Sequence, residues 1–67
     1  MKLYRVLTGI DDSAFCHRVT AALNKGWSLE GSPQITAKPD GTIICAQAIV
    51  KDVPGIDYDP EMKLSDF

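Results

Sequence analysis

The chain has 67 residues, of which 45% are hydrophobic, and a formal net charge of −2 at pH 7. This length fits a single domain with a small core, since such a chain buries only about 60% of the surface that it exposes when unfolded. No apolar run approaches the roughly 20 residues of a membrane span. The charged opening Met1–Arg5 is unlike a secretory leader, and two cysteines are too few for a disulfide framework. We therefore expect a cytoplasmic protein with reduced thiols and no membrane partner.

Charge is unevenly distributed along the chain. Residues 1–51 carry six basic and four acidic side chains, whereas residues 52–67 carry one basic and five acidic side chains. This distribution predicts a weakly basic domain at residues 1–52, followed by an acidic C-terminal arm at residues 53–67. The arm either folds back onto the domain, lies across a neighbouring copy or stays solvated. Because the overall charge is negative, we do not expect a nucleic-acid partner.

The first predicted elements are a strand at residues 2–8 and a helix that ends near Lys25. Asp11 or Asp12 is the expected N-cap, because a carboxylate accepts the free N–H groups of the first helical turn. Gly26 follows the last periodic residue. It predicts the end of the helix, since glycine adopts the left-handed conformation without a Cβ clash.

The predicted helix has one apolar side. At 100° per residue, five apolar side chains fall within an arc of about 120°. These side chains are Phe15, Cys16, Val19, Ala22 and Leu23. An arc of this width is typical of a helix that lies on one face of a sheet.

A second strand is predicted at residues 27–38 and a third at residues 42–51. Gly31-Ser32-Pro33 interrupts the second strand. Because proline lacks the N–H group that a central strand donates, we expect a bulge, an edge or a bend at this point.

The sequence Lys38-Pro39-Asp40-Gly41-Thr42 is typical of a hairpin turn between these strands. Closure of this turn pairs Lys38 with Thr42, and hence Ile35 with Cys45. A bulge near Pro33 would move the side chains that precede it to the other face of the sheet.

The third strand is apolar on both faces. Its even-numbered side chains are Ile44, Ala46, Ala48 and Val50, and its odd-numbered ones are Ile43, Cys45, Gln47 and Ile49. A strand of this kind normally has both faces covered. We predict an α+β fold of β-α-β-β order, with one helix packed on one face of a small three-stranded sheet and an irregular acidic arm. A single helix covers one face only, so we infer that another copy covers the second; the pattern leaves open which face receives the helix.

Several short segments in this order resemble a known family. They are Leu3–Gly9, Leu23–Trp27, Gly31-Ser32-Pro33 and Gln47–Lys51. Together, over residues 2–52, they resemble the small bacterial domain of unknown function numbered 1737. The resemblance implies a β-α-β-β domain found in short bacterial and phage proteins. It implies no activity and no catalytic residue.

The sequence shows no catalytic or metal-binding constellation. Cys16 and His17 are adjacent on the predicted helix and point about 100° apart, so they do not form a nucleophile and base pair. Asp57, Asp59 and Glu61 alternate as ligands of a hard cation can, but the rest of a calcium loop is lacking. We expect no enzyme, no cofactor and no metal site.

The candidate interface or pocket residues are Tyr4, Arg5, Trp27, Ile43, Cys45, Gln47 and Ile49. We predict a structural or interaction module that self-associates as a dimer or higher oligomer. One alternative is a small-molecule-binding or regulatory module in which Tyr4, Trp27 and Gln47 line a pocket at the oligomer interface. Another is a nucleic-acid binder that uses Tyr4, Arg5 and Trp27. Gln47 is expected to bond across a subunit interface or to line a pocket, because a buried amide without partners is costly.

Overall fold

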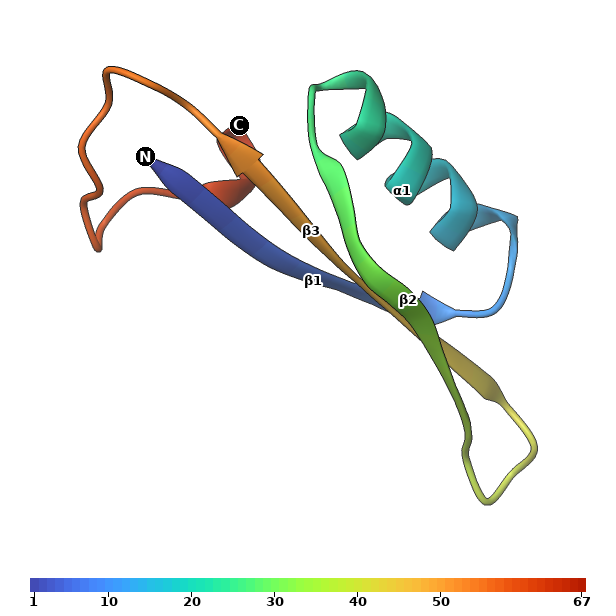
Figure 1. Cartoon of the computed structure of the whole chain (residues 1–67). Coiled ribbons are helices and arrows are strands. Elements are labelled where there is room, and N and C mark those ends of the chain that lie inside the picture. Colours follow the sequence, from blue (N-terminus) through green and yellow to red (C-terminus); the bar gives the residue numbers. More distant parts are fainter.

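The computed structural model describes all 67 residues. The elements follow in the order β1 (Lys2–Ile10), α1 (Ser13–Asn24), β2 (Ser28–Ala37), β3 (Ile43–Asp52) and a short 3₁₀ helix, η1 (Leu64–Asp66). Figure 1 shows α1 on one side of the sheet, with the β2–β3 hairpin extending beyond it. The predicted α+β class and the β-α-β-β order are confirmed.

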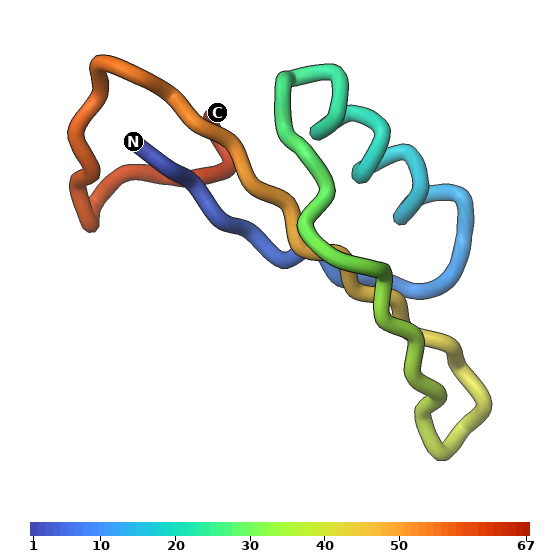
Figure 2. The backbone as a smooth tube through the Cα atoms, viewed as in Figure 1, coloured from blue at the N-terminus to red at the C-terminus, as the bar shows by residue number.

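β3 is the central strand of the sheet. It pairs antiparallel with β1 on one side and with β2 on the other, which gives the order β1-β3-β2. β1 runs two residues beyond its predicted end and stays paired with β3 as far as Ile10, which faces Ile44. The tube in Figure 2 shows the twist of the strands, and the molecule is elongated, measuring 45 × 23 × 19 Å.

Both ends of α1 are capped by the residues at its borders. The Asp12 carboxylate accepts a hydrogen bond of 3.2 Å from the Phe15 N–H, which makes Asp12 the N-cap. At the other end, Gly26 N donates to the Leu23 carbonyl at 3.2 Å and Trp27 N donates to the Ala22 carbonyl at 3.1 Å. Gly26 has a φ of +97°, so the predicted glycine stop is confirmed.

The buried side of α1 is narrower than its apolar arc. Ala22 is buried, and Phe15 and Val19 are half-buried against the core. Cys16 and Leu23, which we expected in the same arc, are exposed. The helix packs mainly against β1, and a hollow lined by Cys16, Val19 and Leu29 lies between it and β2.

The hairpin between β2 and β3 closes as predicted. Lys38 N donates to the Thr42 carbonyl at 2.8 Å, and Gly41 has a φ of +91°. The Thr42 N–H donates to the Asp40 carboxylate at 2.9 Å, and this bond lowers the pKa of Asp40 below its ordinary value.

A bulge in β2 lies opposite Gln47. Three residues of β2, Gly31-Ser32-Pro33, face this single residue of β3, so the bulge adds two residues instead of one. Because the side-chain period of a strand is two, side chains before and after the bulge keep the same phase. The expected change of face is therefore wrong, whereas the predicted pairing of Ile35 with Cys45 is confirmed.

A small core lies between α1 and the sheet. Its buried members are Leu3, Leu7, Ala22, Trp27 and Ile49. The acidic arm returns to this core, and Leu64 and Phe67 pack against its edge. Lys51 Nζ joins the arm to the end of α1, since it donates to the Lys25 carbonyl at 2.6 Å and to an oxygen of Phe67 at 2.8 Å. The arm therefore docks on its own body.

Candidate functional site

The two faces of β3 differ in what covers them. On the side of α1, Cys45, Gln47 and Ile49 are buried, and Ile49 is fully inaccessible. On the opposite side, every apolar residue of β3 is only half-buried. Both α1 and η1 lie on the first side, so the second has no layer over it.

We call this second side the open face. Its apolar stripe consists of side chains from β1 and β3, namely Tyr4, Val6, Ile10, Ile44, Ala46, Ala48 and Val50. Three of them are large and well exposed: Tyr4 at 57%, Val6 at 49% and Ile10 at 55%. β2 contributes polar side chains to the same face, namely Ser28, Glu30, Gln34 and Thr36. The open face is thus apolar over two strands, apart from Thr8 between Val6 and Ile10, and polar over the third.

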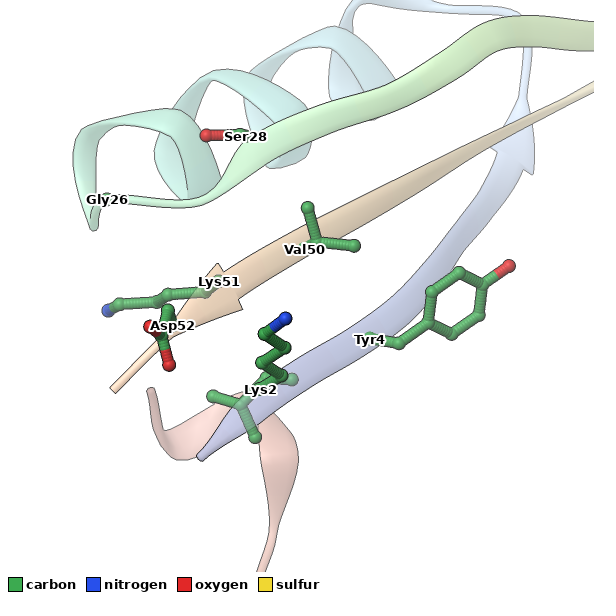
Figure 3. A pocket seen from close by; sticks show the side chains of 8 residues that line it. Lys2, Tyr4, Gly26, Ser28, Val50, Lys51 and Asp52 are labelled. Carbon is green, nitrogen blue, oxygen red and sulfur yellow. The ribbon is translucent and has the colours of Figure 1, made fainter. Parts of the chain in front are cut away.

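A hollow of about 430 Å³ lies at one end of the open face. Figure 3 shows Lys2 and Tyr4 on β1, Val50 on β3 and Ser28 on β2 around it. Lys2 and Asp52 are partners in the β1–β3 register, so opposite charges flank the hollow. It offers the aromatic ring of Tyr4 and the aliphatic side chains of Leu3 and Val50, together with a few polar groups.

The helix side of the sheet holds a second pocket, which is basic. Its volume is about 210 Å³, and three cationic side chains line it: Arg5, Arg18 and Lys25. Trp27 lies in its wall and is 3% exposed. The Arg5 guanidinium carbon lies 5.5 Å from the centre of the Trp27 ring, within the range of a cation–π contact.

Gln47 lines a third hollow, of about 280 Å³, between α1 and β2. Its side-chain amide donates to the carbonyls of Glu30 at 3.4 Å, Gly31 at 3.2 Å and Ala48 at 2.9 Å. The hydrogen bonds that we expected across a subunit interface are therefore made inside the chain. They hold the bulge of β2, whose carbonyls would otherwise lack these donors.

The structure divides the predicted site residues between the two faces. Arg5 and Trp27 lie on the helix side, together with the odd-numbered residues of β3: Ile43, Cys45, Gln47 and Ile49. Tyr4 lies on the open face.

The two sites predicted around these residues do not form. One chain does not bring Tyr4, Trp27 and Gln47 together in one pocket, because Tyr4 lies on the open face and the other two lie on the helix side. The aromatic and basic patch fails for the same reason, and the buried Trp27 ring offers no face for base stacking. The predicted site residues include only Tyr4 from the apolar stripe, although the alternation within residues 2–10 carried part of this signal. The residues that were missed are Val6, Ile10, Ile44, Ala46, Ala48 and Val50.

The polar groups with catalytic potential lie apart. His17 and Cys16 are exposed on α1, whereas Cys45 is buried in the sheet. Burial raises the pKa of the Cys45 thiol above its ordinary value, with a further contribution from the nearby Asp11 carboxylate. The thiol is therefore protonated at neutral pH, whereas the thiolate is the reactive form of cysteine. No group of three or more metal-ligating side chains gathers in the structure.

Of three comparisons with known proteins, one finds a match. Neither a curated protein nor a solved structure matches the chain. The helices are too short or too polar to cross a bilayer. One family model matches residues 1–52, and its description is a domain of unknown function, DUF1737. These residues comprise β1, α1, β2 and β3, and they leave the acidic arm outside the match. The chain therefore belongs to the DUF1737 family.

Proposed function

We propose that this chain is a non-catalytic interaction module that self-associates through its open face. Two copies pack with their apolar stripes against each other. The observation that carries the proposal is the uncovered second face of β3, an apolar central strand whose other face lies under α1. Face-to-face packing of two sheets, about 10 Å apart, is a common way to cover such a face.

The charges of the open face favour a second copy as the occupant. Lys2 and Asp52 lie at one end, and no charged side chain of β1 or β3 interrupts the stripe from there to Ile10 and Ile44. In a two-fold symmetric dimer the same surface meets itself, so a charged stripe would oppose like charges. The stripe itself avoids that repulsion, and Glu30, the charged side chain that β2 adds to the open face, lies beside the stripe next to Ala48. Ala46 and Ala48 keep its centre low, which permits close approach of the two sheets.

The size of the open face sets the strength of the association. Nine residues of strand span about 30 Å and three strands about 14 Å, so the flat footprint is roughly 420 Å² per copy. Two copies therefore bury about 850 Å², which is just below the roughly 1,000 Å² expected of a stable interface. We expect a dimer with a dissociation constant of micromolar order or weaker, on the scale where 1 μM is about −8.2 kcal/mol. Association also supplements a core of only five buried residues.

Two matched substitutions test the proposal. Val6 on the open face and Leu29 on the helix side are equally exposed, at 49% and 50%. We expect Val6→Glu to abolish the dimer in sedimentation velocity runs at concentrations up to about 500 μM, because it buries like charges at the centre of the interface. Leu29→Glu should leave the dimer intact. A stable monomer at the highest concentration, or loss of the dimer in Leu29→Glu alone, contradicts the proposal.

A second candidate is a small-molecule-binding module that uses the hollow beside Tyr4 and Val50. The hollow lies on the open face, so a second copy would form its roof. A ligand bound there raises the melting temperature in a thermal-shift screen, and Tyr4→Ser removes the gain. Tyr58→Ser is the control, since Tyr58 is an exposed tyrosine of the arm. A screen without hits, or a gain that survives in Tyr4→Ser, contradicts this candidate.

A further inference from the structure

The basic pocket on the helix side gathers positive charge from separate parts of the chain. Arg5 comes from β1, Arg18 comes from α1, and Lys25 is the C-cap residue that directly follows α1. Ser65 of η1 adds a hydroxyl group from the arm. The apolar part of the wall consists of Leu7, Ala21, Ala22 and Trp27.

The cations are held in place but have donors to spare. Arg5 is half-buried, and its guanidinium group lies over the Trp27 ring. None of the guanidinium N–H groups of Arg5 donates to a protein atom. Arg18 donates from one nitrogen to the Thr8 carbonyl at 2.7 Å, which fixes its guanidinium at the edge of β1 and leaves its other nitrogens free. The Lys25 ammonium donates to no protein atom. Each of the three therefore has N–H groups available to an acceptor in the pocket.

No acidic side chain neutralises these charges. The one ion pair within 4 Å joins the amino group of Met1 to Asp52, at 3.7 Å. Like charges around one cavity repel each other, and the repulsion is stronger beside a buried wall than in bulk water. The carbonyl end of α1, which would oppose an anion, is partly neutralised because Lys51 donates to the Lys25 carbonyl at 2.6 Å.

We propose that this pocket binds a phosphate group, either as the free ion or as a phosphate ester. A phosphate carries a charge of about −1.5 to −2 at pH 7 and three strong acceptor oxygens. These properties match three cations that line one cavity. The planar guanidinium groups of Arg5 and Arg18 fit phosphate oxygens in pairs, and Trp27 orients the first of them. A carboxylate accepts hydrogen bonds from fewer donors than a phosphate group does, and it neutralises less of the positive charge.

Titration of the full chain with inorganic phosphate at constant ionic strength tests the proposal. The fluorescence of Trp27, the only tryptophan, reports on the pocket because Arg5 lies over its ring. We expect a saturable change, and chemical shift changes in NMR spectra that centre on Arg5 and Arg18. Acetate at the same ionic strength should give a much weaker response. A response without saturation, or an equal response to acetate, overturns the proposal.

Variants locate the site. Arg5→Met and Arg18→Gln should each weaken binding by about tenfold or more, as expected for lost hydrogen bonds to a charged group. Arg18 is exposed, so Arg18→Gln tests the site even where Arg5→Met disturbs the core. Lys38→Met removes the same charge from the distant hairpin and should change the affinity less than twofold. Equal losses in Arg18→Gln and Lys38→Met overturn the proposal, since they indicate attraction by net charge alone.

The source of the phosphate follows from a second titration, with adenosine monophosphate. Tighter binding of the nucleotide than of inorganic phosphate assigns the pocket to a phosphate ester. Tighter binding of inorganic phosphate assigns it to the free ion. Binding of either compound supports a phosphate site if that binding is lost in Arg18→Gln. Nucleotide binding that survives in Arg18→Gln overturns it.

Discussion

The two faces of β3 have similar apolar content but different roles. On the helix side, Ile49 is fully buried beneath α1. The side-chain amide of Gln47 donates hydrogen bonds to carbonyls at the β2 bulge. On the open face, Ile44 and Val50 remain half-exposed beside the large exposed residues of β1. Hydrophobicity alone therefore does not identify the core of a small domain. The layer above each face decides whether an apolar residue stabilises the monomer or stays available for a partner.

The largest expected effect is on the free energy of unfolding, and it is tested with one substitution on each face of β3. Ile49→Ala should lower the free energy of unfolding by about 2–5 kcal/mol, because it leaves a cavity in the core. Ile44→Ala, in the same strand on the open face, should lower it by less than half as much in the dilute monomer. Urea unfolding at low protein concentration measures both. An equal loss of unfolding free energy in the two variants would show that Ile44 is as well covered in the monomer as Ile49.

The next largest effect concerns Gln47, the polar residue on the helix side of β3. Gln47→Leu removes the donor of three carbonyls and should cost about 1–3 kcal/mol, since these partly buried carbonyls lose a hydrogen-bond donor. Amide hydrogen exchange should rise around the bulge, at residues 30–34. Gln34→Leu is the control, because its amide is exposed and makes a single long bond of 3.5 Å. Unchanged exchange in Gln47→Leu would rule out a role for this residue in holding the bulge.

A smaller effect is expected where the arm joins the helix side. Lys51→Met removes two hydrogen bonds, one to the end of α1 and one to Phe67. Since this ammonium group is partly solvated, the loss should be about 1 kcal/mol. Limited proteolysis should cut the arm faster in Lys51→Met than in Lys38→Met. The same rate in both variants would mean that apolar contacts alone hold the arm.

The smallest effect is a pH dependence of the free energy of unfolding that comes from Cys45, on the helix side of the sheet. The pKa of Cys45 is raised in the folded chain, so the unfolded chain loses this proton first as the pH rises. The stabilisation from this group is complete below the ordinary cysteine pKa of about 8.5, and it is lost as the pH rises through the folded value. Urea unfolding between about pH 7 and pH 10 should show a steeper decline for the natural chain than for Cys45→Ala. Cys16→Ala, which changes the exposed thiol, should decline as steeply as the natural chain.

Local patterns in the chain were sufficient for much of the fold. Asp12 and Gly26 marked the helix ends, because capping and positive φ depend on one or two residues. The turn at residues 38–42 set the pairing of Ile35 with Cys45, because a tight hairpin determines its own register. The size of the bulge escaped this reasoning, since a sequence does not say whether Pro33 accompanies one extra residue or two.

The assignment of the two faces required the assembled structure. A strand that is apolar at both odd and even positions carries no alternation, so its pattern does not tell which side meets the helix. That choice came from how α1 lies against β1 and from the side on which the arm returns, both of which involve residues distant in sequence. It separated Tyr4 from Trp27, and it brought Arg5 to Arg18 and Lys25. Contacts of this kind form only when the strands are already paired. For this reason the basic pocket was not visible in the order of residues, and the alternation within residues 2–10 showed only part of the open face.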